Sequence, residues 1–316
     1  MKKTALLALA VALVLLAACT VPAAPAPSAT PSPQPQEEIL QPTPAPTPDT
    51  APKFSYDEYP RVDGSTANLP LMAAVLSRVT GMELPDAEAH TSCTTTPYAY
   101  ESLINGTADL LLVYEAAEET KELIENSGVA LDFIPIGRDA LVFIANESNP
   151  VSGLTISQLT DIYTGKITNW KAVGGEDSEI AAFQRSSSSG SQALFMKLLM
   201  KGKEPMQAPT EFYPTEMGAL IEALAEYNNA GNAIGYSVYY YANYMYAKPG
   251  LKFLAINGVA PSDESIASGK YPFVNEFFAV VRANEPEDSP ARQIANWLST
   301  PQGKELIRDA GYVPTP

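Results

Sequence analysis

A run of small hydroxyl side chains beside an arginine is the part of the sequence best suited to chemistry. Arg185 precedes four serines at positions 186–189, and Gly190, Ser191 and Gln192 follow. Ser189 and Gln192 have the spacing of a capping box, with the serine as N-cap. A helix N-terminus offers unpaired backbone N–H groups and the positive end of the helix dipole. Together with the planar guanidinium of Arg185, the run predicts a site for a small tetrahedral anion.

Two further hydroxyl clusters stand at predicted helix starts. Residues 63–67 (Asp-Gly-Ser-Thr-Ala) lead into an apolar run of helical spacing that ends at Gly81, with Pro70 in its first turn. Residues 94–97 (Thr-Thr-Thr-Pro) open a predicted helix that stops near Gly106. For any one of these clusters alone, ordinary helix capping is the better explanation. Three clusters and an arginine together favour an anion site.

The chain resembles the phosphate-binding lipoproteins of phosphate ABC transporters, a family of the periplasmic-binding-protein superfamily. The resemblance extends from about Tyr59 to Pro314. The stretch Ile-Tyr-Thr-Gly-Lys-Ile-Thr-Asn-Trp at 162–170, followed by Arg185 and the Ser-Gly-Ser of 189–191, is specific to this family. The other matching motifs lie at 63–70, 103–109, 154–159, 233–237 and 311–314.

The resemblance implies an α/β, two-lobed periplasmic-binding-protein fold with a central ligand cleft and a two-strand hinge. We expect the bilobal domain at 53–316, with lobe 1 at about 53–137 and 276–316 and lobe 2 at about 146–266. The implied function is capture of inorganic phosphate and its delivery to ABC permease subunits. We expect no enzymatic activity, no cofactor, no metal and a monomer.

The expected ligand-binding residues come from the hydroxyl clusters and from the positions that the resemblance implies. Arg185 would neutralise the charge of the anion, and hydroxyl and backbone N–H groups would complete a dry cage that closes by a hinge motion. The expected set is Ser65, Thr66, Ala67, Thr95, Thr96, Glu115, Arg185, Ser189, Gly190 and Ser191.

One position departs from the family pattern. Family members commonly carry an aspartate that accepts the proton of hydrogen phosphate, and sulfate, which has no such proton, is rejected. The corresponding position here is Tyr114, with Glu115 next to it, whereas Asp109 matches another acidic position that we interpret as structural. Either Glu115 takes over as acceptor, or this chain achieves discrimination differently.

The N-terminus has the pattern of a lipoprotein signal peptide at 1–18. Lys2 and Lys3 precede an apolar segment at 5–16 that is too short to span a membrane. Residues 16–19 (Leu-Ala-Ala-Cys) resemble the bacterial lipobox, which implies cleavage before Cys19 and its lipidation, with palmitate as one acyl group. We therefore expect a protein anchored by lipid alone on the extracytoplasmic face of the cell membrane. The alternative is an ordinary secretory signal with an incidental cysteine.

A proline-rich segment follows the predicted lipidation site. Residues 21–52 contain eleven of the 28 prolines and almost no bulky apolar side chains. Such a segment buries too little surface to offset its ordering entropy, so 19–52 should be a disordered linker. A docking ligand for an SH3-like partner has no support in an exported bacterial protein.

The remaining 260 or so residues exceed a typical single core and indicate two lobes. Strand-like runs at 110–113, 140–144 and 277–281 alternate with amphipathic helices, which predicts an α/β architecture with mostly parallel sheets.

The composition excludes several functions. The formal charge of −16 argues against nucleic-acid binding. It does not argue against a small anion, because distant exposed charges are screened over about 8 Å. The only histidine is His90, so a serine triad has no evident base, and no zinc, EF-hand or nucleotide-binding motif is present. The tyrosine-rich stretch at 236–244 fits a half-buried strand or helix better than a sugar-stacking platform.

The main alternative function is a tethered oxyanion or phosphate sensor, or a surface interaction module, that uses the same cleft without a permease. An enzyme is a third possibility, which the missing base disfavours.

Overall fold

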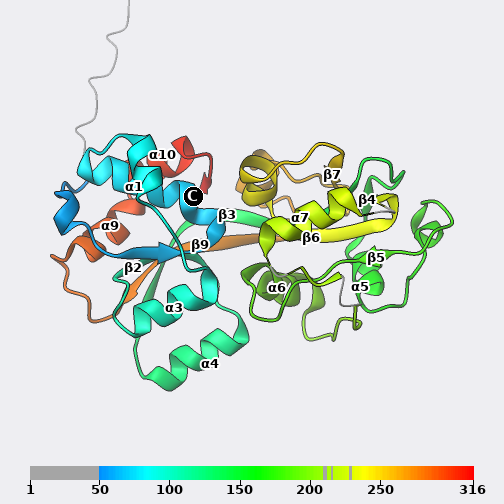
Figure 1. The fold of residues 1–316 in the computed structure, drawn as a ribbon, viewed down its shortest axis with the longest axis horizontal. Helices are drawn as coiled ribbons and strands as arrows, with labels where there is room; N and C mark the ends of the chain where they lie inside the picture. The colour runs from blue at the N-terminus through cyan, green and yellow to red at the C-terminus, as the bar shows by residue number, and fades with distance from the viewer. Residues whose placement is uncertain (1–49, 209–211, 215, 228–229) are drawn as a thin grey trace, which may run out of the picture. The chain divides into compact units, whose positions relative to one another are not determined.

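Two long antiparallel strands, β3 (Leu131–Asn146) and β9 (Val274–Arg282), organise the computed structural model. It describes residues 50–316 except 209–211, 215 and 228–229. β3 pairs with β9 over Leu131–Ala140 and then, from Leu141 to Ala145, with β6 (Ala233–Val238). One strand therefore belongs to two halves of a single sheet, and Figure 1 shows β3 and β9 running between them.

The first half of the sheet has the order β1-β2-β9-β3. β1 (Val62–Gly64) and β2 (Leu110–Tyr114) are parallel, while β2 and β9 are antiparallel, and β10 (Val313–Pro314) pairs with the other edge of β3. The helices of this half are α1 (Leu69–Thr80), α2 (Leu84–Ala89), α3 (Thr96–Ile104), α4 (Glu118–Ser127), α9 (Pro290–Leu298) and α10 (Pro301–Asp309). We call these strands and helices the first lobe.

The second half continues from β3 to β6 and β5 (Ala181–Ala182), with β7 (Leu251–Phe253) also paired to β3. A separate pair joins β4 (Gly153–Leu154) and β8 (Ala255–Ile256). The helices are α5 (Ile156–Tyr163), α6 (Gly190–Phe195), α7 (Met217–Glu226) and α8 (Asp263–Ala267), with π-helical turns η4 (Met196–Met200) and η7 (Tyr241–Met245). We call the elements packed on this half the second lobe.

The two-lobed α/β fold is confirmed, and the three predicted strand runs lie within β2, β3 and β9. The prediction of mostly parallel sheets is wrong. β3 pairs antiparallel with β6, β7, β9 and β10, and among the residues that the structure describes the parallel pairs are the short ones, β1–β2, β5–β6 and β4–β8. The physical reason is connectivity: the chain leaves the first lobe along β3 and returns along β9, so the two strands must run in opposite directions.

A buried carboxylate marks the point where β3 changes partners. Asp139 is 2% exposed and accepts hydrogen bonds from the Tyr114 hydroxyl (2.6 Å), the Ala140 N–H (2.7 Å) and the Tyr240 N–H (3.1 Å). Burial raises its pKa to about 6, although these donors act in the opposite direction. Because Tyr114 ends β2 and Tyr240 follows β6, Asp139 ties the two lobes together at the sheet.

Aromatic packing fixes the second lobe against β3. The rings of Tyr236 and Phe195 are stacked, 4.4 Å apart, and Tyr163 contacts both. Tyr240 stacks in the same way on Tyr312 near the C-terminus. The tyrosine-rich stretch thus begins as a buried strand and continues into a helical turn in which Tyr241 and Ala242 are buried and Tyr244 is exposed. This agrees with the half-buried strand or helix that its pattern predicted.

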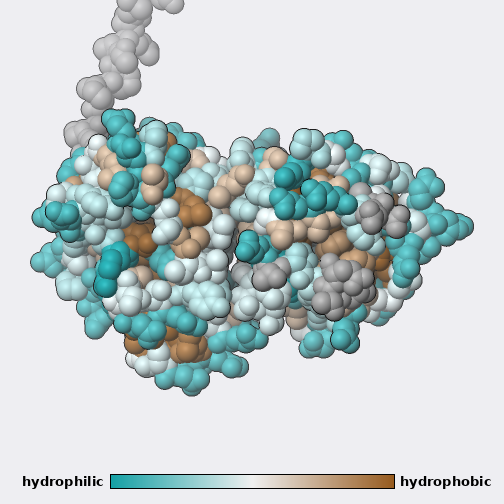
Figure 2. Space-filling model, viewed as in Figure 1, coloured by the Kyte–Doolittle hydropathy of each residue, from teal (hydrophilic) through white to brown (hydrophobic). Residues whose placement is uncertain are grey.

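Residues 48–316 form one compact unit, separate from residues 1–47. The signal peptide, Cys19 and most of the predicted linker lie outside the described residues, so these predictions stay predictions. Within the described part of the chain, no helix is both long and apolar enough to cross a membrane. Hydrophilic side chains cover much of the face in Figure 2, where a hollow lies between the two lobes.

Candidate functional site

A cavity of about 660 Å³ lies between the lobes and collects the hydroxyl clusters of the sequence. Its wall in the first lobe comes from the residues that follow β1, from the end of β2 and from the start of α3. Its wall in the second lobe comes from the start of α6, from α7 and from η7. The lining residues are Ser65, Thr66, Cys93, Thr95, Thr96, Pro97, Tyr98, Tyr114, Arg185, Ser186, Ser188, Ser189, Gly190, Ser191, Glu216, Met217, Gly218, Ala219, Glu222, Val238, Tyr241 and Tyr246.

Ser65 and Thr96 form the buried part of the first wall. Their exposed fractions are 2% and 7%, and their hydroxyl oxygens are 2.8 Å apart. Ser65 Oγ also accepts a hydrogen bond from the Tyr114 N–H (3.1 Å), so one hydroxyl links β1, β2 and α3. Tyr114 lines the cavity, but its own hydroxyl donates to Asp139.

Asp63 shapes the loop that carries Thr95. Its carboxylate accepts hydrogen bonds from the Gly64 N–H (2.7 Å), the Thr94 N–H (2.8 Å) and the Thr94 hydroxyl (2.5 Å). The next residue, Thr95, has φ = 77°, which is costly for a β-branched side chain. The loop is therefore held in a strained conformation where it faces the cavity.

The second wall is the start of α6. Ser189 is the N-cap, as predicted, and its hydroxyl accepts from the Gln192 N–H (3.1 Å). The reciprocal half of the predicted capping box does not form, because the Gln192 side chain accepts a hydrogen bond from the Tyr236 hydroxyl instead. The Ser191 hydroxyl lies 3.4 Å from that of Ser189, and Ser191 is 1% exposed.

Arg185 places a buried positive charge at this wall. It is 7% exposed, and its backbone N–H donates to the Tyr236 hydroxyl at 3.0 Å. Burial lowers the pKa of its guanidinium, and the nearby Tyr236, Tyr241 and Glu216 side chains partly offset this effect. A guanidinium stays protonated in proteins, so the cavity contains a cation with a planar fork of donors.

The two walls touch at Gly190. A Cβ atom built on Gly190 would lie 2.9 Å from Thr96 Oγ1, closer than an ordinary contact. The start of α6 and the start of α3 therefore meet across the cavity, and a side chain at position 190 would fit in this arrangement only if Thr96 moved.

Eight of the ten expected ligand-binding residues line this cavity: Ser65, Thr66, Thr95, Thr96, Arg185, Ser189, Gly190 and Ser191. Ala67 does not. It is completely buried, and its carbonyl accepts a hydrogen bond from the Tyr312 hydroxyl at 2.7 Å.

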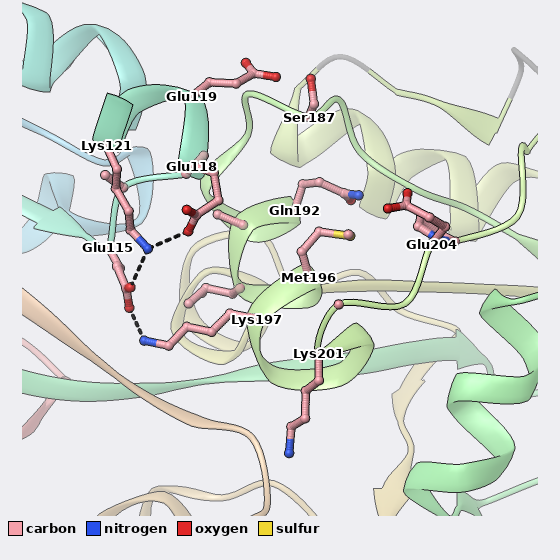
Figure 3. A pocket seen from close by; sticks show the side chains of 16 residues that line it. Glu115, Glu118, Glu119, Lys121, Ser187, Gln192, Met196, Lys197, Lys201 and Glu204 are labelled. Atoms are coloured by element: carbon pink, nitrogen blue, oxygen red, sulfur yellow. Dashed lines mark hydrogen bonds and ion pairs between the residues drawn. The ribbon is translucent and has the colours of Figure 1, made fainter. Parts of the chain in front are cut away.

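The structure does not bring Glu115 into the cavity either. Glu115 lines a second cavity of about 570 Å³, where its carboxylate lies between two ammonium groups, that of Lys121 (3.0 Å) and that of Lys197 (Figure 3). Burial would raise the pKa of Glu115, but the hydrogen bonds from both lysines outweigh burial and lower it. Because Lys197 belongs to η4 in the second lobe, this ion pair joins the lobes beside the main cavity.

Asp109 also lies away from the cavity. Its carboxylate pairs with Arg61 (2.6 Å) and Arg282 (3.0 Å), and although partial burial opposes ionisation, these arginines hold its pKa at about 2. This arrangement agrees with the structural role predicted for it.

Several cavity residues could not be predicted from the sequence. Glu216, Glu222, Tyr241 and Tyr246 all come from α7, η7 and their flanks. The only available signal was the tyrosine-rich stretch, which contains Tyr241 but gives no indication of which ring faces the cavity.

The polar groups that line the cavity are suited to binding a small anion. The His90 ring contacts the Asp86 carbonyl (2.8 Å) and the Tyr56 ring, away from the cavity. Among the described residues, no group of three or more His, Cys, Asp or Glu side chains could hold a metal ion. The cavity offers one buried guanidinium and several hydroxyl donors to a small anion.

Comparisons with known proteins point to one family. The phosphate-binding protein PstS of Bacillus subtilis is 26% identical over 254 residues, which cover 80% of this chain and 79% of that protein. PstS of Borreliella burgdorferi is 29% identical over 198 residues, covering 61% and 68%. A Clostridium perfringens protein whose crystal structure contains bound phosphate has the same fold, with a TM-score of 0.62, 23% identity and coverage of 82% and 100%. A family model, the PBP superfamily domain, matches residues 35–300. The chain therefore belongs to the PBP superfamily.

Proposed function

We propose that this protein captures inorganic phosphate between its two lobes and delivers it to the permease of an ABC importer. The observation that carries the proposal is the convergence of Arg185 and three hydroxyl clusters on one interlobe cavity. The names of the PstS relatives support the same ligand.

In the proposed site, Arg185 neutralises the anion through a charge-assisted, two-pronged contact. Ser189, Gly190 and Ser191 contribute hydroxyl and backbone donors from the second lobe, and Thr95 and Thr96 approach from the first. Ser65 and Thr66 complete the cage. Ala67 and Glu115 are not included, because Ala67 is fully buried and the Glu115 carboxylate is already paired with two lysines.

We propose the lobe boundaries expected from the sequence, 53–137 with 276–316 and 146–266. The hinge would lie where β3 changes partners between Ala140 and Leu141, and where residues 266–276 lead back into β9. Asp139, with hydrogen bonds to both lobes, would limit bending at this point. The Glu115–Lys197 ion pair would favour the closed arrangement.

We also propose that the N-terminus anchors the protein. Cleavage before Cys19 and lipidation would hold it on the extracytoplasmic face of the cell membrane, and residues 19–52 would act as a tether of roughly 100 Å at about 3 Å per residue. The monomeric state and the permease contact belong to the same proposal.

Calorimetric titration of residues 20–316 tests the ligand, since the compact unit is contained in that fragment. We expect saturable binding of phosphate with one site per chain, and no binding of a panel of neutral sugars. Binding of a sugar without binding of phosphate would contradict the proposal.

A further inference from the structure

The run of three threonines at the start of α3 is attached to the end of β1 and its neighbour at two points. Thr94 donates two hydrogen bonds to the Asp63 carboxylate, from its N–H (2.8 Å) and from its hydroxyl (2.5 Å). The Thr96 hydroxyl oxygen lies 2.8 Å from that of Ser65. Thr95 lies between these two attachment points, so its backbone conformation depends on where its neighbours are held.

Thr95 has a backbone conformation that glycine tolerates and other residues rarely adopt. Its φ of 77° and ψ of 162° fall in a region that is almost restricted to glycine, and such a residue persists only where the surrounding structure over-determines it. Thr95 is the N-cap of α3, but its side chain makes no capping hydrogen bond. Because the usual benefit of a threonine N-cap is absent, helix capping does not explain the strain.

The strained residue lies where it affects the anion cavity. Thr95 and Thr96 line that cavity, whereas the described residues that line it do not include Asp63 or Thr94. Thr96 is also the residue that faces Gly190 of the second lobe. A relaxed Thr95 would change the direction in which the chain enters α3, and Thr96 would then move away from Gly190.

We propose that Asp63 is a positioning residue for anion binding. By holding Thr94, it keeps Thr95 in its strained conformation, and the hydroxyls of Thr95 and Thr96 are then in place before the ligand arrives. The inference rests on the proposed function, because it concerns the same cavity and the same anion. Its physical basis is preorganisation: the folded protein sustains the strain, so the ligand does not have to impose it.

The test is calorimetric titration of phosphate into variants of Asp63. Asp63→Ala removes the acceptor of all three hydrogen bonds. Asp63→Asn removes the same charge, but its side-chain oxygen can still accept from the Gly64 and Thr94 N–H groups, which bind one and the same carboxylate oxygen in the wild type. The matched control is Asp109→Ala, which removes a carboxylate of the same lobe that pairs with two arginines away from the cavity.

We expect Asp63→Ala to weaken phosphate binding about 5- to 150-fold, the range for one strained residue whose conformation the ligand must then impose. Asp63→Asn and Asp109→Ala should bind phosphate within about threefold of wild type. Since the alanine and asparagine variants of Asp63 lose the same charge, the difference between them measures the hold on Thr94 rather than electrostatic repulsion.

A second pair of variants tests the strain itself. Thr95→Ala and Thr95→Gly both lack the hydroxyl and differ only in the Cβ atom that makes the conformation costly. Thr95→Gly should melt at the same temperature as Thr95→Ala or higher, which is the reverse of the usual order. The loss caused by Asp63→Ala should persist in the Thr95→Ala background and shrink to about threefold or less in the Thr95→Gly background. If Asp63→Ala does not fold, Thr94→Val replaces it in this cycle, because it removes only the hydroxyl contact.

Phosphate affinity of Asp63→Ala within threefold of wild type would overturn the inference, as would an equal loss in Asp63→Asn or Asp109→Ala. An equal loss in the two backgrounds at position 95, or a lower melting temperature for Thr95→Gly than for Thr95→Ala, would do the same. These results would leave the proposed function standing, because it depends only on the titration of the wild-type protein. Wild-type protein that did not bind phosphate would overturn both.

Discussion

Replacing Gly190 with alanine adds a single methyl group. This change should weaken ligand binding without lowering the stability of the free protein. Gly190 is the first residue of α6 and contacts Thr96 of the other lobe. A Cβ atom would lie 2.9 Å from Thr96 Oγ1, whereas ordinary contacts begin at 3.4 Å, so the groups must separate by about 0.5 Å. Thr96 cannot turn away freely, because its hydroxyl is hydrogen-bonded to Ser65 at 2.8 Å.

The expected cost in the closed state is about 1–3 kcal/mol, the usual range for overpacking. We therefore expect Gly190→Ala to weaken phosphate binding by about 5- to 150-fold. Stability without ligand should not fall. Gly190 is not among the glycines with positive φ, and alanine at such a position stabilises by about 0.4–1 kcal/mol through the unfolded state.

The assay is calorimetry with phosphate, together with thermal unfolding of the free protein. A matched control repeats Gly190→Ala in a Thr96→Ala background, which removes the clashing atom and leaves the Thr96 Cβ at an acceptable 3.5 Å. The penalty of the methyl group should then largely disappear. Binding within threefold of wild type, an equal penalty in both backgrounds, or a melting temperature several degrees lower would refute the reasoning.

Three other predictions address the charge, the hinge and the anchor. Arg185→Ala should cost about 2–5 kcal/mol of phosphate binding, with Arg185→Lys recovering only part of it, and calorimetric affinity within threefold of wild type would contradict the site. Burial raises the pKa of Asp139 from 3.8 to about 6, so the native state binds a proton in this range that the unfolded state lacks. The free energy of unfolding should therefore fall by about 2 kcal/mol as pH rises from 4 to 6, and denaturant titrations of Asp139→Asn should lack this change. Cys19→Ala should release protein from the membrane fraction, because a lipid chain contributes about 0.8 kcal/mol per buried CH₂, and an unchanged detergent partition would argue against lipidation.

Local features of the site could be predicted from sequence because they depend on neighbours along the chain. Ser189 caps α6, Gly81 ends α1 in the left-handed conformation, and Thr155 forms a capping box with Gln158. Each of these depends on hydrogen bonds or φ values within a few residues. The grouping of the hydroxyl clusters with Arg185 was predicted from their shared chemistry, and the motif resemblance supported it.

The side-chain partners that complete the site could not be predicted in this way. Gln192 has the spacing of a capping box, but its side-chain oxygen accepts a hydrogen bond from the hydroxyl of Tyr236, which is 44 residues away. Glu115 is next to the expected acceptor position in sequence. In the structure, however, it follows the end of β2 and its carboxylate lies between Lys121 of the first lobe and Lys197 of the second.

Local sequence patterns and shared motifs predicted the alternation of helices and strands, the helix starts that bear the hydroxyls, and the family. The folded structure was needed to show which strands run antiparallel, that Gly190 meets Thr96, and that Glu216 rather than Glu115 lines the cavity with Arg185. The physical reason is the distance along the chain between the residues that interact. Caps and turns depend on backbone geometry over about four residues, whereas the cavity forms where segments some 90 residues apart, such as those of Thr96 and Gly190, approach across two lobes.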